Sequence, residues 1–301
     1  MAMHARPEGL DRYLASWVPG PVTVRDELPA APAERLGALL DLPRPLPDGD
    51  LLPPMWHWLY FLEWPAQAEL GADGHPGEGH FLPPLPDRRR MFAGGRAEWR
   101  AAPTLGVSAS RVSTLHDVRV KQGSSGEMVF VTVRHEISQG AQVCVVEESD
   151  FVYRSGEDPR RQAMHAIDTE HAPAADASWQ LARRPDPTLL FRFSALTANA
   201  HRIHYDAPYT EQVEGYPGLV VHGPLLVLLM LELVRRSAPE RQLHSLTYRL
   251  RRPLFAGEQL LALGEPQPDD GAELRVATAR EPRHATVEVR FLEGPEARRP
   301  Q

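Results

Sequence analysis

The sequence has a single cysteine, Cys144, among its 301 residues. No disulfide can therefore form within the chain, and a zinc site built from several thiolates is excluded. Because disulfides mark oxidising compartments, their absence favours a reducing cytoplasm. Cys144 lies in the apolar run AQVCVVEE. We predict that it is a buried thiol of a strand, since free cysteine behaves mostly as a small hydrophobic residue.

Long apolar runs and an excess of basic charge are also missing. The most apolar stretch, GLVVHGPLLVLLMLELV at 218–234, contains a histidine, a proline and a glutamate and falls short of a clean membrane span. No apolar signal segment is visible near the N-terminus. The formal net charge of −7 argues against general nucleic-acid binding, which depends on neutralising phosphates. We expect a cytoplasmic protein that binds neither membranes nor nucleic acid.

The first half is dominated by β-rich runs. Residues 96–154 include RVSTLHDVRVK and MVFVTVRHEI, which flank a turn signal, QGSSGE. This pattern predicts an antiparallel meander. Short helices are expected at 10–19, 33–41 and 54–64. Residues 155–186 are polar and alanine-rich without sustained periodicity, which is typical of a linker.

The second half is predicted to begin with a strand, TLLFRFSALT, at 188–197. A histidine-bearing loop and the apolar stretch follow, and the latter is apolar nearly all round, as expected of a buried helix. Four further strands are predicted, at 242–251, 258–264, 272–280 and 284–292. One apolar helix followed by several strands cannot form βαβ units. It indicates an α+β hot-dog domain, in which an antiparallel sheet wraps a helix.

Two segments suggest that this domain occurs twice. EWRAAPTLG at 98–106 and YRLRRPLFAG at 248–257 each contain an aromatic residue, an arginine, a proline and a closing glycine. We therefore predict a double hot-dog with an N-terminal domain at 1–160, a linker at 161–186 and a catalytic domain at 187–301. The first domain is expected to bind the acyl group and CoA. Tandem copies would form the pair that single domains make by dimerising, and a homodimer of the whole chain is a further expectation.

The segment FSALTANAHRIHYDAPYTEQVEGYPGLVVHGPLLVLLMLELV resembles the catalytic region of MaoC-like enoyl-thioester hydratases and dehydratases. In the first half, LLPPMWHWLYFLE, ELGADGHPGEGHFLPPLPDRRRMFAGG and VFVTVRHEI support the resemblance. It covers residues 10–295. The chain is most similar to the branch that includes mesaconyl-C4-CoA hydratases and type 2 3-hydroxyacyl-thioester dehydratases.

The resemblance implies that His204 transfers protons. The family's motif has an aspartate five residues before this histidine, where this chain has Asn199, whose amide cannot take up a proton. Independently of the resemblance, adding water to a C=C bond conjugated to a thioester needs a base for water and an acid for Cα. One imidazole can serve as either. We therefore assign both steps to His204 and expect Asn199 to orient the water.

Gly223 is the third candidate catalytic residue. The apolar helix is expected to begin at Pro224, because proline is favoured at the first helical position. The N–H of Gly223 would then point at the thioester carbonyl, at the positive end of the helix. Such a donor stabilises the enolate-like charge that develops during the reaction.

Several residues near these three are candidates for substrate binding. His201 is expected either to line the site or to cap the loop. His222 is expected either to bind the substrate or to hold a structural position behind the site. Arg202 either holds a substrate carboxylate or anchors the loop, whereas Asp206 and Tyr209 are expected to shape a turn. The candidates for substrate binding are His201, Arg202, Tyr205, Gly218, Val220, His222, Arg90 and Arg251.

No metal or separate cofactor is expected. The spacing of His201 and His204 has the wrong phase for one helix face, and no carboxylate lies at ligand spacing. CoA would be part of the substrate. The predicted reaction is hydration of mesaconyl-C4-CoA or itaconyl-CoA to citramalyl-CoA. The alternatives are dehydration of linear 3-hydroxyacyl thioesters on CoA or acyl-carrier protein, thioester hydrolysis, and non-catalytic binding of acyl-CoA.

Overall fold

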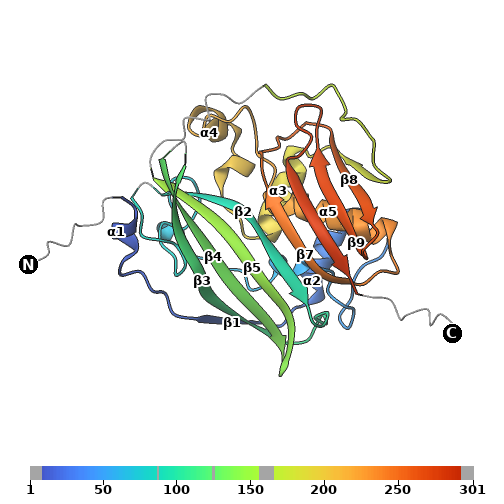
Figure 1. Cartoon of the computed structure of the whole chain (residues 1–301), viewed down its shortest axis with the longest axis horizontal. Helices are drawn as coiled ribbons and strands as arrows, with labels where there is room; N and C mark the ends of the chain where they lie inside the picture. Colours follow the sequence, from blue (N-terminus) through green and yellow to red (C-terminus); the bar gives the residue numbers. More distant parts are fainter. Residues whose placement is uncertain (1–8, 87, 124–125, 156–165, 293–301) are drawn as a thin grey trace, which may run out of the picture.

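The computed structural model describes residues 9–86, 88–123, 126–155 and 166–292 and is built around one antiparallel sheet (Figure 1). Ten strands follow one another in the order β1-β3-β4-β5-β2-β7-β10-β9-β8-β6. The strands are β1 Val22–Asp26, β2 Arg88–Trp99, β3 Ala109–Gly123, β4 Gly126–Gln139, β5 Gln142–Ser155, β6 Trp179–Arg183, β7 Leu243–Leu250, β8 Leu260–Gln267, β9 Gly271–Ala277 and β10 Ala285–Phe291. The four strands predicted after the apolar helix are therefore confirmed.

The sheet consists of two copies of one topology. In the first half the order from the centre outward is β2, β5, β4, β3 and β1, and in the second it is β7, β10, β9, β8 and β6. Each half therefore starts with its outermost strand, places its second strand at the centre, and then fills the positions between these two from the outside inward. This confirms the α+β double hot-dog. β6 lies inside the predicted linker at 161–186, so the second copy starts before residue 187, with a short edge strand that shows no pattern in the sequence.

The two similar segments occupy equivalent places in the two copies. Thr104, after β2, forms an isolated bridge with Leu51, and Phe255, after β7, forms one with Val220. The next residues along, Leu52 and Val221, donate their backbone N–H groups to Pro103 and Leu254 at 2.7 and 2.8 Å. The internal resemblance in the sequence thus reflects a repeated turn.

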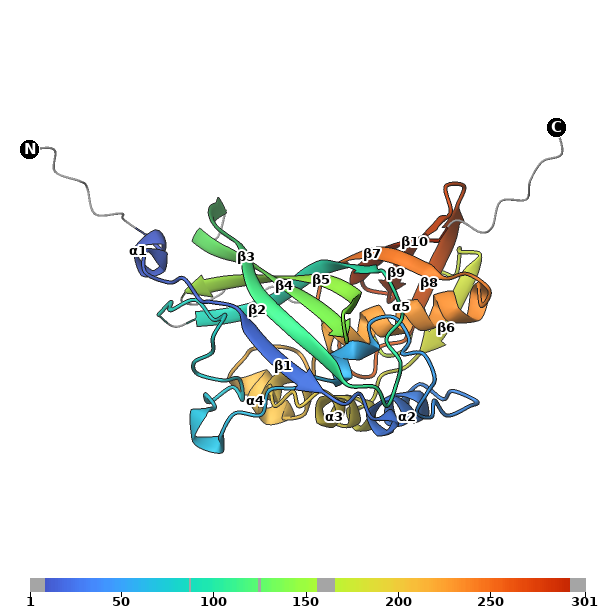
Figure 2. The ribbon, with the colours of Figure 1, turned by 90° about the horizontal axis from the view of Figure 1, so that it is seen from below.

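The helices lie on one face of the sheet, except the first, which stands beside one end of it (Figure 2). They are α1 Asp11–Leu14, α2 Ala30–Leu39, α3 Pro187–Leu196, α4 Ala207–Gln212 and α5 Gly223–Ser237, with short 3-10 turns η1 Trp56–Leu59, η2 Gln67–Glu69 and η4 Arg202–His204. α5 is buried along most of its length, as its apolar sequence predicts. Its one buried carboxylate, Glu232, pairs with Arg235 and Arg236. Nowhere in the described ranges is a helix long and apolar enough to cross a membrane.

Three local predictions need correction. The strand predicted at 188–197 is helix α3, because Asp186 caps it by accepting from the N–H of Leu189 at 2.7 Å and Pro187 occupies the first turn. The helix expected at 10–19 is only the four-residue α1, and that at 54–64 is the 3-10 turn η1. Helix α2 is present, and Cys144 is buried in β5 as predicted.

The two halves are joined where β2 pairs with β7. Gly95 lies opposite Tyr248 on β7 and Ser149 on β5. A Cβ atom at residue 95 would lie 2.4 Å from the carbonyl oxygen of Glu148 and 2.5 Å from the Tyr248 hydroxyl. Only glycine therefore fits at this point of the central sheet.

We expect Gly95→Ala to lower the free energy of unfolding by about 1–3 kcal/mol, the usual cost of overpacking a close-packed site. Urea denaturation measures this change. Gly20→Ala is the matched control, because a Cβ there meets no atom within 4 Å, and its effect should stay within about 0.5 kcal/mol. Equal stability of the two variants would contradict the tight junction.

Candidate active site

The segment between α3 and α5 carries the histidines. Asn199 follows α3, and its Oδ1 accepts the backbone N–H of His201 at 3.0 Å. The 3-10 turn η4 then places His204 below the sheet, and Asp206 caps α4 by accepting from the N–H of Tyr209. The predicted role of Asp206 and Tyr209 in shaping this turn is thus confirmed.

His204 is buried, and its orientation is fixed by one hydrogen bond. Its Nδ1–H donates to the carbonyl of Val220 at 2.7 Å. Nε2 is therefore the nitrogen that carries the lone pair in the neutral ring. Burial lowers the pKa of His204 to about 3, although the bond to Val220 acts in the opposite direction. The imidazole is thus a neutral acceptor at neutral pH.

Gly223 is the first residue of α5, one position earlier than predicted. Its N–H cannot be paired within the helix, because the first amides of a helix have no carbonyl four residues back. A Cβ at this position would lie 2.3 Å from Cδ1 of Leu250 on β7, so glycine lets the helix start pack closely against the sheet. Val220, which holds His204, is only three residues earlier.

Both groups line the same cavity of about 1950 Å³, whose walls come from both halves of the chain. It is bordered by aromatic residues of the first half, such as Trp58 and Phe92, and by arginines of β2 and of the segment after β7. The predicted site residues that line it are Asn199, His201, His204, Tyr205, Val220, Gly223, Arg90 and Arg251.

Three predicted substrate-binding residues lie outside this lining. Arg202 donates to Asp206 at 2.7 and 2.9 Å and to the carbonyl of Ala72 at 2.9 Å, contacts that favour the anchoring role. A Cβ at Gly218 would lie 2.7 Å from Ile167, so this glycine permits packing. His222 is fully buried behind His204.

His222 supports His204 from behind. The two rings stack with centroids 3.7 Å apart, and His222 Nε2 lies 2.9 Å from Oγ of Ser194 on α3. Burial lowers the pKa of His222 well below its ordinary value, so it too is neutral. This arrangement matches the structural position considered for His222. The neutral His222 ring packs against the face of the His204 ring and places no charge beside it.

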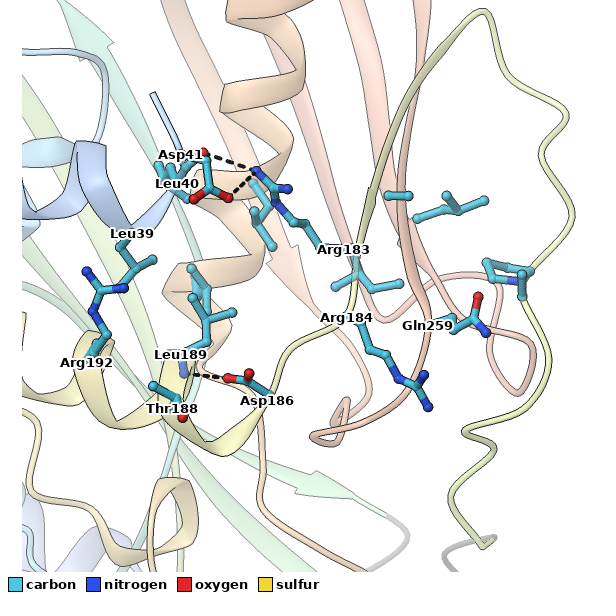
Figure 3. A pocket seen from close by; sticks show the side chains of 17 residues that line it. Leu39, Leu40, Asp41, Arg183, Arg184, Asp186, Thr188, Leu189, Arg192 and Gln259 are labelled. Atoms are coloured by element: carbon cyan, nitrogen blue, oxygen red, sulfur yellow. Dashed lines mark hydrogen bonds and ion pairs between the residues drawn. The ribbon is translucent and has the colours of Figure 1, made fainter. Parts of the chain in front are cut away.

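A smaller cavity of about 720 Å³ lies among α2, α3 and β6 (Figure 3). Arg183, one of three arginines that line it, is held by the carbonyl of Leu40 at 3.1 Å and by Asp41 at 3.4 Å. None of the predicted site residues lines it. Because it lacks both the imidazole and the free amide, we place the site in the larger cavity.

A loop of the first half that was not predicted to belong to the site also reaches it. Asp73 and His75 lie beside His201, and one donor atom from each of the three falls within 4.8 Å of the others. The rings of His75 and His201 pack at a tilt, with centroids 3.9 Å apart. In the sequence, the sign of this loop is the Asp-Gly-His run within ELGADGHPGEGHF, a stretch that supports the family resemblance.

The first half also places a buried polar network in the wall of the cavity. Glu147 accepts from Trp58 Nε1 at 2.9 Å and Ser149 Oγ at 3.0 Å, and His57 Nε2 lies 2.7 Å from it. Burial would raise the pKa of this carboxyl, but the hydrogen bonds hold it well below its usual range. Tyr248 of β7 approaches the same carboxylate at 3.4 Å, which links the network to the second half.

Comparison with known proteins identifies the family. The family model of hydroxyacyl-thioester dehydratase type 2 matches residues 55–256. That match spans more than half of the chain, so the protein belongs to this family of MaoC-like hydro-lyases. The chain is 42% identical over 255 residues to the mesaconyl-C(4)-CoA hydratase of Chloroflexus aurantiacus, covering 84% of this chain and 89% of that protein.

The chain is also similar to more distant proteins, one in sequence and two in fold. The mitochondrial hydroxyacyl-thioester dehydratase type 2 of Schizosaccharomyces pombe is 27% identical over 273 residues, covering 79% of this chain and 88% of that protein. A MaoC-like dehydratase of Phytophthora capsici superposes with a TM-score of 0.64 at 10% identity, covering 95% of this chain and 99% of the other. HtdX of Mycobacterium tuberculosis gives 0.59 at 17% identity, with 91% and 100% covered.

The buried neutral histidines predict a pH dependence of stability. The pKa values of His204 and His222 are lowered in the folded state, so below about pH 6.5 the unfolded chain binds protons that the folded chain does not. Stability should therefore fall as the pH decreases from 6.5 toward 4, by about 1.4 kcal/mol per pH unit for each such group. Urea denaturation at several pH values measures the slope.

His204→Gln should reduce that slope by the share of one histidine. His116→Gln is the control, because His116 is about half exposed on β3, with 47% of its side chain accessible. His204→Gln should reduce the slope by more than this control does. An identical slope in His204→Gln and the unsubstituted protein would mean that residue 204 is charged or exposed when folded.

Proposed function

We propose that this protein hydrates a C=C bond conjugated to a CoA thioester, and that its substrate is a short branched dicarboxylyl-CoA. Hydration of mesaconyl-C4-CoA to citramalyl-CoA is the reaction we favour. The observation that supports the reaction type is that His204 and Gly223, the first residue of α5, line one cavity. The acyl group is supported by the identity of 42% to a mesaconyl-C(4)-CoA hydratase.

The proposed reaction needs only groups already in place. Nε2 of His204 takes a proton from water as the water oxygen bonds to the β-carbon of the substrate. The electrons of the C=C bond move toward the thioester carbonyl, whose oxygen gains negative charge. The N–H of Gly223, at the N-terminus of α5, stabilises that oxygen. Protonation of Cα then restores the thioester and completes the addition of one water molecule.

Asn199 fits the positioning role expected of it. Its Oδ1 is occupied by the backbone N–H of His201, so its NH₂ group is the one that can donate toward the cavity. A donor at this place holds the water oxygen without competing for the proton that His204 takes. The amide cannot act as an acid or a base itself.

Conjugation favours mesaconyl-C4-CoA over itaconyl-CoA. In mesaconyl-C4-CoA the double bond lies next to the thioester carbonyl, so addition of water generates the enolate that the Gly223 amide stabilises. In itaconyl-CoA with the thioester on C4, one CH₂ separates the two groups, and this stabilisation is lost. Dehydration of linear 3-hydroxyacyl thioesters is the second candidate, which the match to the type 2 dehydratase family supports.

A panel of enoyl-CoA thioesters tests the proposal. We expect hydration of mesaconyl-C4-CoA with kcat/KM at least about tenfold above that of crotonyl-CoA, followed as loss of the conjugated double bond. His204→Ala should lower kcat by about 10²- to 10⁴-fold, the usual contribution of a general base. Asn199→Ala should cost about tenfold, because only the orientation of water is lost.

The exposed substitution His116→Gln is the control and should leave the rate unchanged. Faster turnover of crotonyl-CoA would support the linear dehydratase in place of the dicarboxylyl enzyme. Release of free CoA thiol without hydration would identify a thioesterase. An active His204→Ala variant would remove the mechanism, and tight binding without turnover of any thioester would indicate an acyl-CoA binding protein.

A further inference from the structure

We propose that Asp73 and His75, which belong to the first half of the chain, form a carboxylate–imidazole pair that carries out the second proton transfer in this active site. The inference rests on the proposed hydration. In the family motif a carboxylate stands at the position of Asn199, and an amide cannot replace it in proton transfer. The pair from the first half would supply the missing acid, with His75 as the proton donor and Asp73 as its positioning residue.

The loop that carries the pair is docked on the catalytic loop by backbone contacts. The N–H of Arg202 donates to the carbonyl of Asp73 at 2.8 Å, and the Arg202 guanidinium donates to that of Ala72 at 2.9 Å. Gly74 has a φ of +88°, and a Cβ there would lie 1.9 Å from the carbonyl oxygen of Ala200. No side chain fits between the two loops at this point, so their close approach depends on the glycine at residue 74.

Asp73 orients the imidazole of His75. Its Oδ2 lies 3.0 Å from Nδ1 of His75, and its Oδ1 accepts the backbone N–H of the same residue at 3.0 Å. With Nδ1–H directed at the carboxylate, Nε2 is the nitrogen left for proton transfer. A carboxylate that fixes the tautomer of an imidazole and stabilises its protonated form is the arrangement used in serine hydrolase triads.

His75 belongs to a continuous row of imidazoles that ends at His204. Its ring packs at a tilt against that of His201, with centroids 3.9 Å apart, and His201 meets His204 edge-on with centroids 5.5 Å apart. His75, His201 and His204 all line the large cavity. A substrate in this cavity can therefore face His204 from the second half and His75 from the first.

A metal site explains the same residues less well. Two imidazoles that ligate one ion must direct their lone pairs at a common point. The rings of His75 and His201 instead pack against each other, with centroids 3.9 Å apart and an interplanar angle of 36°. Both oxygens of Asp73 are already bonded to His75. These contacts fit a carboxylate–imidazole pair better than a cation site.

In the proposed reaction His204 and His75 each carry out one of the two proton transfers. His204 Nε2 removes a proton from water while the oxygen–Cβ bond forms. His75 starts protonated, and its Nε2 proton is transferred to Cα as the enolate collapses. His204 is left protonated and His75 neutral. Solvent in the cavity returns the proton from His204 to His75, so the net change is addition of one water molecule to the substrate.

His75→Ala tests the proposal through chemical rescue. We expect kcat for the hydrated thioester to fall by about 10²-fold or more, with the Kd for the saturated analogue methylsuccinyl-CoA changed by less than about threefold. Added imidazole should restore the rate at least about tenfold, because it supplies the missing acid. Asp73→Asn should lower kcat by about tenfold and leave the same Kd unchanged. His75→Gln, which keeps a polar side chain in the loop, covers the case in which the alanine variant does not fold.

The chain contains a matched control pair. His171 is paired with Asp168 through the same kind of Nδ1 contact, at 3.1 Å, but it is exposed and outside the cavity lining. His171→Ala should therefore have wild-type kcat and no response to imidazole.

The other possible results would overturn either this inference alone or the proposed function as well. Nearly normal kcat in both His75→Gln and His75→Ala would overturn the inference, and so would a loss that imidazole does not rescue or that matches a loss of methylsuccinyl-CoA affinity. Stoichiometric zinc in the purified enzyme that disappears in Asp73→Asn would overturn it in favour of a metal site. If His204→Ala is inactive while the His75 variants are normal, only this inference fails. If the wild type hydrates no thioester, the proposed function fails with it.

Discussion

The hydrogen bond from His204 to the carbonyl of Val220 is the contact on which the site depends. It ties an imidazole in one loop to the segment that leads into α5, and so brings a proton acceptor and a free helix amide to the same cavity. The bond also selects the tautomer, because the nitrogen that donates to Val220 cannot face the substrate. Burial beneath the sheet then keeps the imidazole neutral, ready to accept a proton.

A difference between the two copies of the fold explains why the second half carries this arrangement. Leu51 and Leu52 occupy the places that Val220 and Val221 have in the second copy. After Val221 the chain enters the fifteen-residue α5, whereas after Leu52 it enters the four-residue turn η1. A long helix concentrates partial positive charge at its first amides, and a single 3-10 turn does not. The first half instead contributes walls of the cavity.

Much of the fold follows from the sequence alone. α5 and the strands after it were predicted correctly because their apolar patterns are long and unambiguous. The apolar run TLLFRFSALT was predicted as a strand, and its helical state depends on the Asp186 cap and packing against α2. β6 was missed because WQLAR is a short edge strand with no distinctive alternation.

The candidate site was predictable only in part. His204, Asn199 and Gly223 lie in one continuous motif, so their proximity follows from local sequence. The contact of Asp73 and His75 with His201 joins loops that are far apart in the chain, and no local pattern specifies it. The role of Arg202 could not be decided from the sequence either, because its contacts with Asp206 and Ala72 are evident only in the folded chain.

The most direct test is a crystal structure of the His204→Ala variant with mesaconyl-C4-CoA bound. The account predicts the thioester carbonyl oxygen within about 2.7–3.1 Å of the Gly223 nitrogen, with the β-carbon of the acyl group facing the vacated place of the imidazole. A thioester bound on another surface, or with its carbonyl turned away from the start of α5, would contradict it.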